Sequence, residues 1–137
     1  MMFIPDLSLS KRRIQIGNRG AVLVFEVGSL EFMRPDDPYR SVVEELEKEG
    51  IGRNVFMVDN SGLPIWRVES QGEYKFGNAV DAFIGIWGRD KAICSKREYQ
   101  DFVDESCGYV YGQTFYGFIY KIRLSDGALS DRTWTKE

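Results

Sequence analysis

Histidine is absent from this chain of 137 residues, which also has only two cysteines and four prolines. Without histidine, Ser-His and Cys-His nucleophile pairs, the commonest general base, and most zinc and haem sites are excluded. Cys94 and Cys107 match no disulfide framework and no metal motif. Asp104 and Glu105 lie just before Cys107 and disfavour a reactive thiolate there. We therefore expect two reduced thiols, no metal centre and no enzymatic activity.

The sequence also lacks long apolar runs, an excess of basic residues and glycine-rich phosphate motifs. No run approaches the roughly 20 residues of a membrane span. The apolar start is interrupted at Asp6 and has no basic residue before it, unlike a signal peptide. A formal net charge of −3 gives no long-range attraction to a phosphate backbone. Neither GxGxxG nor a P-loop motif occurs. We expect a cytoplasmic protein with no cofactor, no membrane association and no nucleic-acid partner.

Aromatic residues are plentiful at 14% of the chain, which favours strands over helices. Apolar runs separated by turn residues predict about eight short strands, most of them in hairpins. These strands are expected at about 14–16, 21–27, 55–58, 64–69, 82–87, 108–114, 118–123 and 128–135, and 91–94 is a candidate for a further short one. Residues 82–87 are apolar on both faces, which is typical of a central strand.

One helix is predicted at 39–49, where apolar residues recur at helical spacing after Pro38 and a pair of aspartates. The segment 95–105 favours a second helix or helical turn, with Ser95 as N-cap and Glu98 at the capping-box position. The prediction is a single domain, 1–137, of α+β class. Its sheet is mainly antiparallel, with one or two helices inserted.

The segment VFMVDNSGLPIWRVE, residues 55–69, predicts a hairpin that turns at Asp59–Gly62 and restarts with Trp66 in the core. The turn is acidic, but it lacks the later acidic ligand of a twelve-residue calcium loop. Adjacent carboxylates occur elsewhere, and on loops and helix faces they are typical of solvated surface rather than of catalysis. These pairs are Asp36/Asp37, Glu44/Glu45 and Asp104/Glu105.

Three segments occur in an order that resembles a known group of small bacterial proteins. The segments are NVFMVDNSGLPIWRVE, FIGIW and GYVYGQTFYGFIYKIRLSDG. The group looks like immunity proteins of polymorphic and contact-dependent toxin systems, and its hairpins are similar to blade fragments of PQQ-binding β-propellers. The resemblance covers roughly residues 54–135 and, more loosely, 14–27. It implies a protein that binds and neutralises a cognate bacterial toxin domain by occluding its active site or functional surface. It transfers no cofactor-binding residue.

This chain departs from the family pattern at 36–50, where it has a helix, and at 94–107, where the segment is longer. Both departures are acidic, and acidic residues on an inhibitor would favour contact with a basic cleft on a toxin. The predicted partner-binding residues are Asp36, Asp37, Glu44, Glu45, Glu47, Asp101, Asp104 and Glu105.

Two other functions remain open. The first is a small ligand-binding module or uncharacterised enzyme, with Trp66, Trp87 and Tyr111 lining an aromatic pocket. The second is a subunit that adds an exposed strand edge to a larger assembly.

Overall fold

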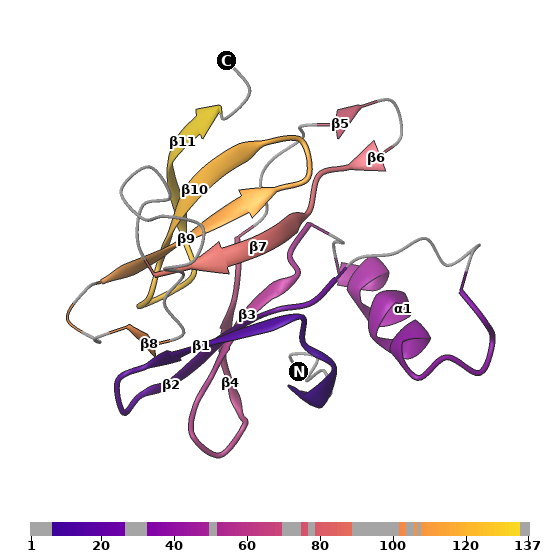
Figure 1. Ribbon diagram of the computed structural model, residues 1–137, viewed down its shortest axis with the longest axis horizontal. Coiled ribbons are helices and arrows are strands. Elements are labelled where there is room, and N and C mark those ends of the chain that lie inside the picture. The colour runs from indigo at the N-terminus through magenta and orange to yellow at the C-terminus, as the bar shows by residue number, and fades with distance from the viewer. Residues whose placement is uncertain are drawn as a thin grey trace.

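The computed structural model describes residues 7–26, 33–49, 52–69, 75–76, 79–88, 102–103, 106 and 108–134. These residues form two main β-sheets packed face to face, and the α-helix α1 (Tyr39–Glu49) packs on the outer face of the first sheet (Figure 1). The 3-10 helix η1 (Leu7–Leu9) precedes the first strand. The predicted α+β class with mainly antiparallel strands is therefore confirmed.

The first sheet has the strand order β4-β3-β2-β1-β8. Its longer strands are β1 (Arg12–Ile16), β2 (Gly20–Val24), β3 (Val55–Val58) and β4 (Pro64–Arg67), each antiparallel to its neighbour. The short strand β8 (Phe102–Val103) pairs in parallel with Gln15 and Ile16 at the edge of β1.

The second sheet has the strand order β11-β10-β9-β7 and is antiparallel throughout. It contains β7 (Phe83–Trp87), β9 (Tyr109–Thr114), β10 (Phe118–Arg123) and β11 (Leu129–Trp134). A separate small hairpin joins β5 (Lys75–Phe76) and β6 (Ala79–Val80).

Strand β2 is buried along its whole length because it has a hydrophobic core on each side. Val22 and Val24 point toward the second sheet, whereas Ala21 and Leu23 point toward α1. This alternation follows from the two-residue period of a strand. The run AVLV, apolar on both faces, thus specifies a strand between two apolar layers.

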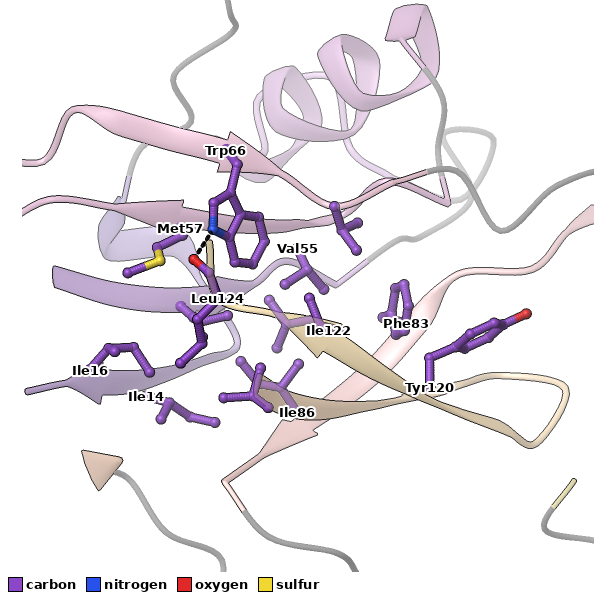
Figure 2. Packing of buried hydrophobic residues seen from close by; sticks show 14 of the residues in the cluster. Ile14, Ile16, Val55, Met57, Trp66, Phe83, Ile86, Tyr120, Ile122 and Leu124 are labelled. Carbon is purple, nitrogen blue, oxygen red and sulfur yellow. Dashed lines mark hydrogen bonds between the residues drawn. The ribbon is translucent and has the colours of Figure 1, made fainter. Parts of the chain in front are cut away.

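Trp66 anchors the core between the two sheets, as predicted. Its indole Nε1 donates a hydrogen bond to the Leu124 carbonyl oxygen at 2.8 Å, which links β4 to the end of β10 (Figure 2). Gly127 lies against the flat side of the ring, where an added Cβ would stand 2.6 Å from Trp66 Cε3. Asp59 closes the preceding turn by accepting the N–H groups of Ser61 and Leu63, so the predicted turn is confirmed as well.

The structure corrects two sequence predictions. Residues 82–87 were expected to form a central strand, but β7 is the terminal strand of the second sheet. Its apolar character reflects burial on its faces, because Phe83 and Ile86 lie in the core between the sheets and Trp87 stacks on Tyr111. Side chains of residues 11, 12 and 54 cover its outer edge. In the segment 95–105, Phe102 and Val103 form a strand rather than part of a helix, since they pair with β1. The rest of that segment and the candidate strand 91–94 lie outside the described residues.

Candidate functional surfaces

Helix α1 turns its acidic side away from the sheet. Val42 and Leu46 are buried against β2 and β3, and Tyr39 packs beside them. Helical geometry therefore places Glu44 and Glu47 on the opposite side, where both are exposed. The structure thus places Glu44 and Glu47, two of the predicted partner-binding residues, on one exposed surface of the helix.

The N-terminus of the helix is fixed by two contacts. Asp37 Oδ1 accepts the backbone N–H of Tyr39 at 2.9 Å, so this predicted partner-binding residue serves as a cap. The Tyr39 hydroxyl donates to the carbonyl oxygen of Glu26, just beyond β2. Burial of the phenol, followed by the nearby Glu26 carboxylate, raises the pKa of Tyr39. The second contact ties the start of α1 to the segment just after β2.

Not every acidic residue of α1 is available to a partner. Glu44 forms an ion pair with Arg40 at 3.1 Å, and Glu45 forms one with Lys48 at 2.9 Å. These exposed pairs stabilise little, but each reduces the local negative charge. Asp36 and Glu47 are exposed, and no ion pair joins either one to another described residue. The second predicted patch, Asp101, Asp104 and Glu105, lies outside the described residues.

The aromatic residues of the pocket hypothesis do not meet in one place. Trp66 lies between the two sheets, in the main core. Trp87 stacks on Tyr111 with a ring-centroid distance of 6.2 Å, on the face of the second sheet opposite Val110. On that same face the Lys121 ammonium lies 4.6 Å from the Tyr109 ring centroid, a cation–π contact that the sequence analysis did not anticipate.

A small pocket of about 130 Å³ lies at the β10–β11 hairpin. It is lined by Arg123, Ala128, Leu129 and Ser130. It is smaller than the 300 Å³ or so at which small-molecule sites begin. The neighbouring turn is held by an ion pair of 2.6 Å between the Arg123 guanidinium and Asp126 Oδ2. These features indicate a stabilised turn rather than a binding site.

The same ion pair predicts a pH-dependent contribution to folding. The hydrogen bond from Arg123, followed by one from the Ala128 N–H, lowers the pKa of Asp126 to about 2. Because the folded pKa is lowered, the stabilisation is complete above the unfolded pKa of about 3.9 and is lost as pH falls through about 2. We expect NMR titration to give this low pKa, and to give a higher one in R123Q. The control variant R132Q should leave the pKa of Asp126 unchanged, and an unchanged value in R123Q would contradict the assignment.

The described residues contain no cluster of three or more histidine, cysteine, aspartate or glutamate side chains that could hold a metal ion. No helix among them is long and apolar enough to cross a membrane. Comparison of the chain with protein-family models, with curated proteins and with solved structures found no match.

Proposed function

We propose that this chain is an immunity-type protein that binds and neutralises a cognate bacterial toxin domain without catalysis of its own. The order of its hairpin motifs, which resembles that of immunity proteins, supports this function. The observation that carries the proposal is the placement of α1. Its apolar side is buried on the first sheet, and Glu44 and Glu47 are exposed away from that sheet.

The exposed acidic surface suggests how the complex would form. A toxin with a basic cleft would be attracted by Asp36 and Glu47, since neither carboxylate is neutralised by an ion pair to a described residue. Charges at the rim of an interface act mainly on the association rate and on its salt dependence. We therefore assign Asp36 and Glu47 the steering role, and Glu44 a smaller one because Arg40 already pairs with it.

The first experiment tests the function itself. The probe is the C-terminal domain of the protein encoded immediately upstream, expressed with and without this chain. We expect that domain to arrest growth alone, and to co-purify with this chain and lose its toxicity when both are present. Continued growth arrest without complex formation would reject the proposal, as would an upstream gene that encodes no toxic domain.

The second experiment tests the acidic surface with matched charges. The variant D36N/E47Q raises the net charge by two, and S130K/T133K does the same on β11, where both residues are exposed. We expect association of D36N/E47Q with the toxin domain to be about three- to tenfold slower at low salt, with a weaker salt dependence. The β11 control should retain the wild-type rate. Equal rates for the two variants would remove the α1 surface from the interface.

A further inference from the structure

Strand β7 has an outer edge that is closed by side chains instead of by another strand. It is the terminal strand of the second sheet, yet four of its backbone groups have side-chain partners from the first-sheet half of the chain. Asn54 donates to the Phe83 carbonyl oxygen at 2.7 Å and accepts the Phe83 N–H at 3.0 Å. Lys11 Nζ donates to the Ile84 carbonyl oxygen at 3.0 Å, and Arg12 donates to that of Ile86 at 2.5 Å.

The strand under these side chains has the character of a pairing segment. Its sequence, Phe-Ile-Gly-Ile-Trp, is apolar, β-prone and free of charge. Ile84 is 41% exposed on this strand. A row of backbone groups beside exposed apolar side chains is a template for strand addition, and natural sheets often protect such an edge with lysine. Lys11 and Arg12 supply this protection from an adjacent sheet.

The segment is also complementary to itself. If two copies of β7 met antiparallel about Gly85, Ile84 of one copy would stand opposite Ile86 of the other. The carbonyl groups that would accept hydrogen bonds from the second copy are those of Ile84 and Ile86, the same two that Lys11 and Arg12 now use. Gly85 would occupy the close central position, where an added Cβ would have no neighbour within 4 Å in the described part of the chain.

We propose that the β7 edge at Ile84–Ile86 is a strand-pairing surface for a second copy of this chain, held closed by Lys11 and Arg12, while Asn54 keeps the edge at Phe83. Charge supports this pairing partner. The strand itself has no charge to repel a copy, whereas four cations would be brought together if the edges met with Lys11 and Arg12 in place. The two side chains therefore oppose self-association in two ways. They occupy the carbonyl oxygens of Ile84 and Ile86, and their charges would repel those of the second copy.

The test compares two double variants of equal net charge. K11M/R12M removes the two cationic contacts to the edge, while R13M/R19M removes two exposed cations that form no hydrogen bond with the described residues of β7. Sedimentation velocity over a concentration series should show K11M/R12M associating at a concentration about tenfold lower than the control, which should match wild type. Adding I84K to K11M/R12M should abolish the association, because it places like charges at the paired edges.

Three results would overturn the proposal. The first is a folded K11M/R12M variant that associates no more than R13M/R19M. The second is association that persists with I84K, which would assign the contact to another surface. The third is a variant that remains monomeric but binds an added acidic peptide, which would assign the edge to a different partner. If circular dichroism shows that K11M/R12M is unfolded, the single variants K11M and R13M are compared instead. K11M should then associate at a concentration about threefold lower than R13M.

Discussion

The variant N54A is expected to lose about 4 kcal/mol of unfolding free energy, a large part of the stability of an ordinary domain. Asn54 is fully buried. Its Nδ2 donates to the carbonyl oxygens of Phe25 and Phe83, both at 2.7 Å, and its Oδ1 accepts the Phe83 N–H. Alanine would leave three buried backbone groups without partners. Each such group costs about 1–3 kcal/mol.

Urea denaturation followed by circular dichroism measures this loss, and Asn60 provides the matched control. The Asn60 side chain makes one exposed hydrogen bond, to the Asn18 carbonyl oxygen at 2.7 Å. We expect N60A to lose less than about 1 kcal/mol. If N54A and N60A lost equal amounts, the buried hydrogen bonds of Asn54, two of which reach Phe83 in the second sheet, would not stabilise the fold as the geometry indicates.

The second large effect is expected for G20A at the start of β2. Gly20 has a φ of +151°, a conformation that favours glycine, and an added Cβ would lie 1.9 Å from the carbonyl oxygen of Val58. No rotation of a side chain can relieve a contact with backbone, so β2 and β3 would have to separate locally. We expect a loss of about 3 kcal/mol, or a fall in Tm of about 10 °C.

Alanine at another glycine separates the steric clash expected at Gly20 from the general effect of replacing glycine with alanine. Among the described residues, Gly85 has no heavy atom within 4 Å of an added Cβ, and its φ is not unusual. We expect G85A to change the unfolding free energy by no more than about 0.5 kcal/mol. A Tm for G20A within a degree or two of that for G85A would show that β3 adapts without strain, contrary to the prediction.

Local patterns were sufficient to predict most of the elements. Helix α1 begins and ends where spacing and capping predicted, because Asp37 and the apolar positions act within a few residues of one another. The hairpins around Asp59–Gly62 and at β9–β10 follow from turn chemistry and strand alternation in the same way. Phe118, Tyr120 and Ile122, which alternate along β10, are all buried, as the two-residue period of a strand requires for one face.

The division into two sheets could not be predicted from local patterns, since it depends on contacts between distant residues. The bonds from Lys11 and Arg12 to β7 span more than 70 residues. Periodicity does not reveal such a partner, so the sequence predicts a central strand where the structure has an edge covered by side chains. Likewise, a polar residue before a strand is usually solvated, so the sequence does not predict the buried hydrogen bonds of Asn54. Of the proposed interface, Asp37 became a helix cap, whereas Asp36 and Glu47 remained available to a partner.

The complete burial of β2 has a consequence for how the molecule unfolds. One side of this strand belongs to the core beneath α1 and the other to the core between the sheets. Detaching either layer would therefore expose apolar surface on a strand that the other layer needs intact. We therefore expect the two cores to unfold in one transition, so that a defect in either lowers the same free energy of unfolding. Cooperativity here comes from a single shared strand rather than from the size of either core.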